Sequence, residues 1–311
     1  MDAPIFSEVL DCQGVTMLVV RPHPDDESTA TGGMLAYYSA RGVRTGVVIC
    51  TGGEEGQIHD PALDPVADVP RLREIRTREV REAGAILGVA ALQMLGYRDS
   101  GMPGTPANQH PEAFYNADPV EAAGRLVQII RAFRPLVMVI EPPGGLYAHP
   151  DHVTCHRVSV DAFHAAGDAQ AYPEAGPPWR VAKLYAIAHI DDGCWEALRP
   201  EFIAAGIDPA WLERRRDQAR RPGPETATVA LDVRPYSECQ RRALLAHRTQ
   251  IPRDSFLVSL PADLRRRAFA TAYFLRLHPP AAAGEHEQDL LDGLRVSRAS
   301  VNTRPEIRLD T

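Results

Sequence analysis

Short runs of apolar, mostly β-branched residues alternate with longer amphipathic segments through the first two thirds of the 311-residue chain. This alternation is typical of strand–helix–strand units around a largely parallel sheet. Strands are predicted at residues 16–20, 44–50, 91–95, 136–140 and 181–188, and helices at 30–41, 71–87, 119–133 and 152–166. Gly42 and Gly88 end the first two helices, and Pro135 stops the third. The pattern predicts an α/β fold: a Rossmann-like, open, mostly parallel sheet with helices on both faces.

The pattern changes after residue 190. A further strand is predicted at 226–233, followed by helices at 235–249 and 261–277. Residues 191–277 are therefore expected to form a C-terminal α/β cap over the site, or the closing layer of the same domain as the core at 1–190. Proline, alanine and charged residues dominate from 278 to 311, which we expect to be a flexible tail.

Composition excludes several classes of protein. The formal charge of -7 repels phosphates, so no nucleic-acid partner is expected. Lys183 is the single lysine, which excludes a P-loop. The five cysteines are scattered, as is usual in a reduced compartment, and the apolar runs are too short to span a membrane. A cytoplasmic protein without a membrane partner is expected, while the oligomeric state is left open.

Two histidine motifs follow predicted strands. His23, Asp25 and Asp26 lie in His-Pro-Asp-Asp-Glu after the first strand, and two acids beside a histidine are costly to gather unless a cation neutralises them. His149-Pro150-Asp151-His152 follows the fourth strand. Ligands of doubly wound sheets bind beyond the carboxyl ends of the strands, at the switch point, so the two motifs are expected to share one crevice. A His, Asp and His set, with positions left to water, is one that zinc accepts.

A single histidine at a helix start is more often a capping residue than a metal ligand. Here two histidine-rich turns occur at the strand ends where an α/β ligand site should lie, which favours the metal site. His156 lies on the same helix face as His152 and could point the same way. The remaining histidines are expected to be surface or packing residues: His59, His110, His164, His189, His247, His278 and His286.

The two motifs resemble those of the LmbE or PIG-L type zinc N-deacetylases, whose signatures are Ala-His-Pro-Asp-Asp-Glu and His-Pro-Asp-His. The resemblance covers residues 15–190 and extends to Thr51-Gly-Gly-Glu-Glu-Gly56 and Arg98-Asp-Ser-Gly-Met102. These stretches look most like the mycothiol branch, which comprises the deacetylase of N-acetylglucosaminyl-inositol and the mycothiol S-conjugate amidase.

The resemblance implies a role for each motif residue. His23, Asp26 and His152 would bind one Zn²⁺ per subunit, with iron as an alternative. Asp25 would be the general base, and His149 the general acid or oxyanion partner, oriented and charged by Asp151. Tyr147 would help to polarise the carbonyl, and substrate hydroxyls of the sugar or inositol would be held by two further residues, Arg76 and Asp99.

These roles agree with general chemistry. Zinc brings the pKa of a bound water to about 7, so a carboxylate such as Asp25 can take its proton at neutral pH. A carboxylate beside His149 would raise the histidine pKa and keep a proton available for the leaving amine.

The expected function is that of a zinc-dependent amidohydrolase. It would remove the N-acetyl group from an N-acetylglucosaminyl conjugate, a small-molecule amino sugar of low-molecular-weight thiol metabolism. A thiol S-conjugate amidase of the same family is the alternative. The same ligands could also serve a metal-dependent phosphoesterase, or a non-catalytic metal-binding module with a Rossmann-like shell.

Overall fold

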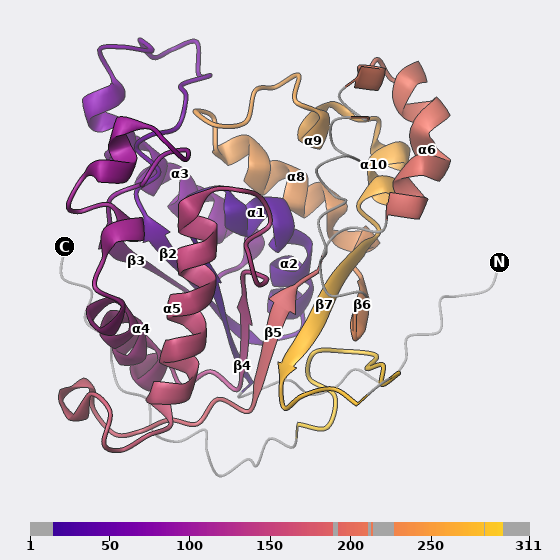
Figure 1. Cartoon of the computed structure of the whole chain (residues 1–311). Coiled ribbons are helices and arrows are strands. Elements are labelled where there is room, and N and C mark those ends of the chain that lie inside the picture. The colour runs from indigo at the N-terminus through magenta and orange to yellow at the C-terminus, as the bar shows by residue number, and fades with distance from the viewer. Residues whose placement is uncertain (1–14, 189–191, 211–212, 214–226, 283, 295–311) are drawn as a thin grey trace.

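The computed structural model of the chain describes residues 15–188, 192–210, 213, 227–282 and 284–294. Seven strands form one sheet in the order β3-β2-β1-β4-β5-β7-β6 (Figure 1). Strands β1 to β5 are parallel, and β7 runs antiparallel to both β5 and β6. The strands are β1 (Thr16–Arg21), β2 (Arg44–Thr51), β3 (Ala91–Tyr97), β4 (Val137–Ile140), β5 (Lys183–Ile187), β6 (Val229–Asp232) and β7 (Thr271–His278).

Helices cover both faces of the sheet (Figure 1). The α-helices are α1 (Asp26–Ala30), α2 (Gly32–Ala40), α3 (Leu72–Leu87), α4 (Pro119–Phe133), α5 (Pro150–Ala166), α6 (Asp192–Ala204), α8 (Ser237–Ala246), α9 (Phe256–Ser259) and α10 (Ala262–Ala268). Single-turn 3-10 helices are η1 (Val69–Arg71), η2 (Pro106–Gln109), η3 (Phe114–Asn116), η4 (Pro173–Ala175) and η5 (Arg234–Tyr236).

The core lies in two layers, one on each face. Successive residues of a strand point to opposite faces, so a strand covered on both sides is a continuous apolar run. In β1, Met17 and Val19 pack with residues of α2, α3 and α8, whereas Leu18 and Val20 pack with residues of α4 and α5. The central strands are therefore buried on both faces, which fixes their carboxyl ends as a rigid platform.

The predicted fold class is confirmed. Helix α3 ends at Gly88, whose φ of 74° is the left-handed conformation that a helix C-cap requires. Strands β1 and β4 are parallel neighbours, with Val19 opposite Val139. Strands β2 and β3 lie on one side of β1, whereas β4 and β5 lie on its other side. The switch point of the sheet therefore falls between β1 and β4.

The C-terminal part of the sheet differs from the sequence-based prediction. The pattern predicts one helix over 261–277, but α10 ends at Ala268 and β7 follows it. The second half of that prediction is wrong because Phe274 is fully buried in β7, between β5 and β6, where aromatic residues pack well. The strand predicted at 226–233 is β6, while residue 226 itself lies outside the described residues. Both strands extend the common sheet, which favours a closing layer over a separate cap.

The described part of the segment after β7 packs against the sheet. Glu287 accepts hydrogen bonds from Lys183 Nζ at 2.5 Å and from the Tyr185 hydroxyl at 2.7 Å. Leu290 and Leu291 are buried in the same core layer as α2. Residues 284–294 are thus held in place, in contrast to the flexible tail that the composition predicts, and residues 295–311 lie outside the described part.

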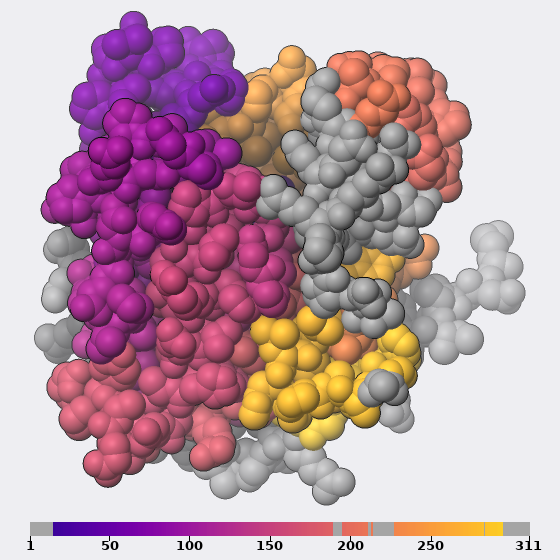
Figure 2. All heavy atoms as spheres, in the orientation of Figure 1, coloured from indigo at the N-terminus to yellow at the C-terminus, as the bar shows by residue number. Residues whose placement is uncertain are grey.

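The loop after β2 contacts the closing layer formed by residues 227–282, which we call the C-terminal layer. The backbone N–H of His59 donates a hydrogen bond to the Thr249 carbonyl at 2.8 Å, and Gln250 Nε2 donates to the Gln57 carbonyl at 2.8 Å. Figure 2 shows this loop in purple at the top of the molecule, next to the orange residues of the C-terminal layer. Among the described helices, none combines the length and the apolar character needed to cross a membrane.

Candidate metal and catalytic site

The two histidine motifs meet at the carboxyl ends of β1 and β4. His23 and Asp26 lie in the turn after β1, and His152 lies in the first turn of α5. Asp26 Oδ2 is 3.3 Å from His23 Nδ1 and 3.5 Å from His152 Nε2. All three side chains are buried, and their possible ligand atoms lie within 4.8 Å of one another. These residues therefore form a group that could hold a metal ion.

A carboxylate behind His152 fixes the orientation of its ring. Glu141 directly follows β4, and its Oε2 lies 2.9 Å from His152 Nδ1. This contact places the ring proton on Nδ1 and leaves a lone pair on Nε2. His152 Nε2 is buried and has no hydrogen-bond partner among the described residues. A buried ring nitrogen in this state, facing Asp26, fits a metal ion.

Arg21 places a positive charge behind the same group. Its side chain is fully buried, forms an ion pair with Glu141, and lies with Nη2 3.7 Å from Asp26 Oδ1. Burial by itself would raise the pKa of Asp26, but His152, His23 and Arg21 hold that pKa well below its usual range. Asp26 is therefore a carboxylate ready to bind a cation.

Asp25 has different surroundings from its neighbour Asp26. Its φ of 113° is a backbone conformation that side-chain-bearing residues rarely adopt, and such strain is concentrated at functional sites. Asp25 Oδ2 accepts a hydrogen bond from Arg76 Nη2 at 3.2 Å. Burial raises the pKa of Asp25 to about 6, although Arg76 acts in the opposite direction. A carboxylate of this kind, next to the metal-ligand group but outside it, has the properties of a general base.

The Arg76 side chain points into the protein. Only 3% of the residue is exposed, and its guanidinium donates hydrogen bonds to the carbonyls of Gly53 and Pro24 as well as to Asp25. A Cβ atom at Gly53 would overlap with Arg76 Nη1, so the close approach requires glycine there. The structure makes Arg76 a support for the turn that carries Asp25, and its contact with a sugar hydroxyl stays a prediction.

Asp151 lies closer to His23 than to His149. Asp151 Oδ2 is 3.2 Å from His23 Nε2 but 4.0 Å from His149 Nδ1. Ser100 donates to the same carboxylate from its backbone N–H, at 3.0 Å, and from its hydroxyl. The carboxylate that faces His149 Nε2 is Asp99, at 3.5 Å. Asp151 thus orients a histidine of the metal group, and Asp99 is the carboxylate beside His149 Nε2.

His149 is the N-cap of α5, and its Nδ1 accepts a hydrogen bond from the Asp151 backbone N–H at 3.2 Å. The neutral ring then carries its proton on Nε2. Burial and the neighbouring charge of His23 lower the pKa of His149 to about 4, with Asp151 and Asp99 opposing this shift. The raised pKa expected from the Asp–His pair is therefore wrong, because burial outweighs the carboxylates. Nε2 of a neutral His149 is a hydrogen-bond donor, which suits an oxyanion partner.

A second group of buried side chains could hold a cation by distance alone. It consists of His23, Asp99, His149 and Asp151. It shares His23 with the first group, however, and the backbone hydrogen bond to His149 Nδ1 leaves a proton rather than a lone pair on Nε2. The group with the free His152 Nε2 is therefore the better metal site.

Tyr147 lies at the rim of the site. The residue is 43% exposed, and its ring centroid is 4.3 Å from that of His152 and 6.0 Å from that of His149. Tyr147 follows two glycines of positive φ, Gly144 and Gly145, in the loop between β4 and α5. The predicted tyrosine is thus beside the metal group and open to the surface.

Some residues that hold the site were missed by sequence reasoning. Glu141 and Ser100 each contact a predicted site residue, and Glu27 caps the backbone of Asp25. The signals for these three were present: an acid directly after a buried strand, a serine next to Asp99, and the last acid of His-Pro-Asp-Asp-Glu. The contact of His247 with Glu27 joins residues 220 positions apart, and no local pattern could indicate it.

Comparison with known proteins agrees with this geometry. The family model described as PIG-L, GlcNAc-PI de-N-acetylase, matches residues 18–163. A 1D-myo-inositol 2-acetamido-2-deoxy-alpha-D-glucopyranoside deacetylase from Acidothermus cellulolyticus is 39% identical over 295 residues, which cover 91% of this chain and 97% of the relative. The chain belongs to the PIG-L family. The resemblance predicted from the two motifs is confirmed.

Two further proteins extend the comparison. A mycothiol S-conjugate amidase from Streptomyces coelicolor is 33% identical over 287 residues, or 90% of this chain and 97% of the relative. The crystal structure of a conserved protein from Thermus thermophilus superposes with a TM-score of 0.55 at 25% identity, over 86% of this chain and 96% of that one. The similarity therefore extends beyond the two motifs to nearly the whole chain.

Proposed function

We propose that this PIG-L family protein is a zinc-dependent amidohydrolase that removes the N-acetyl group from an N-acetylglucosaminyl-inositol-type conjugate in low-molecular-weight thiol metabolism. The observation that carries the proposal is the buried His23, Asp26 and His152 group with the carboxylate of Asp25 beside it. The relative from Acidothermus cellulolyticus, which is named as a deacetylase of such a conjugate, supports the choice of substrate.

The donor set supports zinc as the cofactor, at one ion per subunit, with iron as the alternative. Two imidazole nitrogens and one carboxylate leave positions for water and substrate, as in catalytic zinc sites. When bound, the ion supplies a Lewis acid that polarises a carbonyl and lowers the pKa of a water. His23 and His152 are held for this by carboxylates of their own, Asp151 and Glu141.

In the proposed reaction Asp25 accepts the proton of the attacking water. The Asp25 carboxylate lies outside the ligand group, so it is available to exchange a proton. Arg76 holds this carboxylate in position by a hydrogen bond. Once protonated, Asp25 can return that proton to the leaving amine, which releases acetate and the free amino sugar.

His149 and Tyr147 face the developing negative charge in this proposal. The Nε2–H of neutral His149 donates a hydrogen bond to the oxyanion, and the Tyr147 hydroxyl helps to polarise the carbonyl. Asp99, whose carboxylate lies 3.5 Å from His149 Nε2, is proposed to hold a sugar hydroxyl beside that ring. The second proposed hydroxyl contact is Arg76.

The same arrangement supports an amidase of thiol S-conjugates as the second candidate. The scissile amide would then join glucosamine to an acylated cysteine, and the same residues would serve. The similarity to the Streptomyces coelicolor amidase favours keeping this candidate. In either case the proposed partner is a small amino-sugar conjugate, and the proposed compartment is the cytoplasm, where free thiols such as Cys50 and Cys155 stay reduced.

Amine release from two substrates tests the proposal. The purified protein, loaded with one equivalent of Zn²⁺, is assayed for primary amine and acetate with N-acetylglucosaminyl-inositol and with a mycothiol S-conjugate. Faster turnover of the first substrate supports the deacetylase, and faster turnover of the second supports the amidase. Asp25→Ala is expected to keep its zinc and to lose about 10²–10⁴-fold in kcat.

Other outcomes would reject the proposal. A fully active Asp25→Ala variant contradicts the assigned base. Phosphate release from phosphoesters without amine release would identify a phosphoesterase. A protein that holds zinc and turns over neither amide would be a metal-binding module.

A further inference from the structure

The C-terminal layer contacts the segment that carries Asp25, residues 22–29, which we call the catalytic turn. His247, which follows α8, is fully buried, and its Nε2 lies 2.7 Å from Glu27 Oε1. The other oxygen of that carboxylate, Glu27 Oε2, accepts a hydrogen bond from the backbone N–H of Asp25 at 2.9 Å. One buried carboxylate therefore links the C-terminal layer to the backbone of the proposed base.

The linked backbone is the strained one. The φ of 113° at Asp25 persists only where its surroundings hold it. The Asp25 carbonyl accepts hydrogen bonds from Ser28 and Thr29 at the start of α1, the Pro24 carbonyl accepts one from Arg76, and the Asp25 N–H donates to Glu27. Glu27 is itself fully buried, so its orientation depends on protein donors and not on water.

The donors to Glu27 are few. Ser28 Oγ donates to Glu27 Oε1 at 2.6 Å, and His247 Nε2 contacts the same oxygen. Because Glu27 Oε2 accepts from the Asp25 N–H and Oε1 accepts from Ser28, both oxygens of Glu27 act as acceptors, and His247 directs its Nε2 proton toward Oε1.

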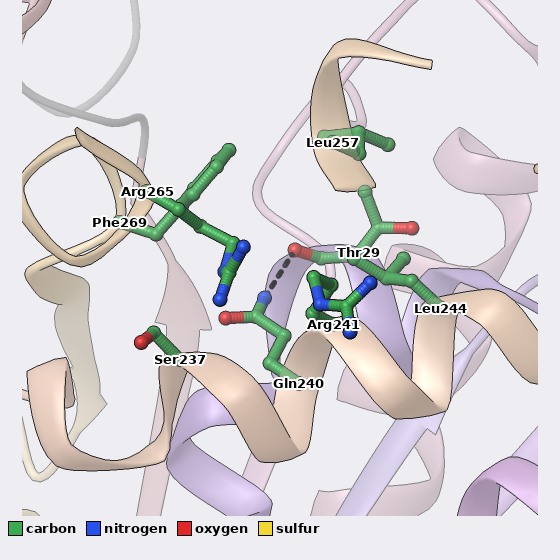
Figure 3. A pocket seen from close by; sticks show the side chains of 8 residues that line it. All are labelled: Thr29, Ser237, Gln240, Arg241, Leu244, Leu257, Arg265 and Phe269. Atoms are coloured by element: carbon green, nitrogen blue, oxygen red, sulfur yellow. Dashed lines mark hydrogen bonds between the residues drawn. The ribbon is translucent and has the colours of Figure 1, made fainter. Parts of the chain in front are cut away.

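A second residue of the same layer fixes the position of this contact. Gln240 of α8 donates from Nε2 to the carbonyls of Ser28 and Thr29, at 3.0 and 3.1 Å. Figure 3, which views the small pocket between α8 and α10, shows Gln240 turned toward Thr29. A Cβ on Gly32 would lie 3.0 Å from Gln240 Cγ, so α8 also packs closely on the start of α2. The helix that precedes His247 cannot shift without moving the catalytic turn.

We propose that His247 is a positioning residue for the general base: it holds Glu27, and Glu27 holds the Asp25 backbone in its left-handed conformation. The inference rests on the proposed function, since Asp25 is the base only there. His247 belongs to neither group of possible metal ligands, and its burial keeps it from the substrate. The C-terminal layer then supports the catalytic turn from behind.

Three variants separate positioning from general stability. His247→Leu removes the donor, and His247→Gln keeps an amide that can reach Glu27. Leu244→Ala, in the last turn of α8, shortens a buried apolar side chain that packs with Ile251 and Val258, and it serves as the matched control. For each variant we would measure the thermal midpoint, zinc affinity by chelator competition, and kcat and KM with N-acetylglucosaminyl-inositol.

The expected result is a fall in kcat of about 10²-fold for His247→Leu, because a misplaced base loses its alignment, while KM and zinc affinity change by less than about twofold. His247→Gln should recover most of the loss. Leu244→Ala should lower the thermal midpoint and keep kcat. Wild-type kcat in His247→Leu would overturn the proposal, as would an equal fall in Leu244→Ala.

Amide hydrogen exchange gives a readout that does not depend on turnover. In His247→Leu, exchange over residues 23–31 should be faster than in wild type, and in Leu244→Ala it should be unchanged. Unchanged exchange in His247→Leu rejects the positioning role even if the protein is active. Wild-type protein without amidohydrolase activity would instead reject the proposed function. If His247→Leu does not fold, His247→Asn replaces it, because its shorter amide does not reach Glu27.

Discussion

The turn after β1 and the loop after β4 supply the same site, yet they are built in opposite ways. In the turn, His23, Asp26 and Glu27 are buried and each contacts another charged or polar side chain. In the loop, the ends, Glu141 and His149, are buried, and the residues between them include Tyr147 at 43% exposure. The difference shows where the molecule is fixed by contacts and where it can adjust to a substrate, and it predicts a graded response to substitution.

The largest effect is expected where the two regions share the metal group. His152→Ala removes the one buried ring nitrogen that faces Asp26 without a hydrogen-bond partner among the described residues. The variant should bind no stoichiometric zinc and show background activity. Metal analysis after dialysis, together with the amine assay, checks this. Full zinc content in His152→Ala would mean that the second group is the metal site.

The next largest effect is expected at the buried end of the loop. His149→Ala removes the proposed Nε2–H donor and should lower kcat by about 10²–10³-fold at unchanged zinc content. The assay is steady-state kinetics on zinc-loaded protein. Zinc loss in this variant would show that His149 is a ligand and not an oxyanion partner.

A smaller effect on catalysis, with a large one on stability, is expected at Glu141. Glu141→Gln removes the closer of the two carboxylates that pair with the buried Arg21, which should cost about 3–5 kcal/mol of the free energy of unfolding. It should also weaken zinc binding by about 10–100-fold, because His152 loses its carboxylate. Denaturant unfolding and chelator competition measure the two effects.

The double variant Arg21→Met with Glu141→Leu separates those two effects. Replacement of both partners by apolar side chains should restore most of the unfolding free energy. Zinc affinity should stay low. If zinc affinity returns with stability, Glu141 does not act by orienting His152.

The smallest effect is expected at the exposed middle of the loop. Tyr147→Phe keeps the ring beside His152 and removes only the hydroxyl of a partly exposed residue, so kcat should fall by about tenfold or less, below the loss for a buried oxyanion donor. Steady-state kinetics at saturating substrate measure this change. A fall as large as that of His149→Ala would remove the contrast between the buried end and the exposed middle of the loop.

The sequence predicted those features that depend on short-range pattern. The parallel core, its helices and the three metal-group residues follow from apolar periodicity and from motifs at strand ends. The partner of Asp151 was predicted less well, because His149 lies two residues before it in the same motif, whereas the helix start turns the Asp151 carboxylate toward His23. Adjacency in sequence is a poor guide to which side chains face one another.

Long-range contacts explain the remaining differences. The Glu141–His152 contact depends on a loop that no local rule predicts, and the His247–Glu27 contact depends on the packing of the whole C-terminal layer. Residues 271–278 form a strand because β5 offers an edge to pair with, which overrides the helical pattern of the segment. Such features become visible only when the chain is assembled in three dimensions.

The place of β7 also determines how the molecule can be made. The strand enters between β5 and β6, so β6 reaches the rest of the sheet only through a segment that is translated later. When residues 1–270 have emerged from the ribosome, every residue of the metal group has been made, but β7 is still missing and the sheet is incomplete. The edge of β5 stays open until residue 278 has emerged, and the chain then closes it from its own C-terminal side.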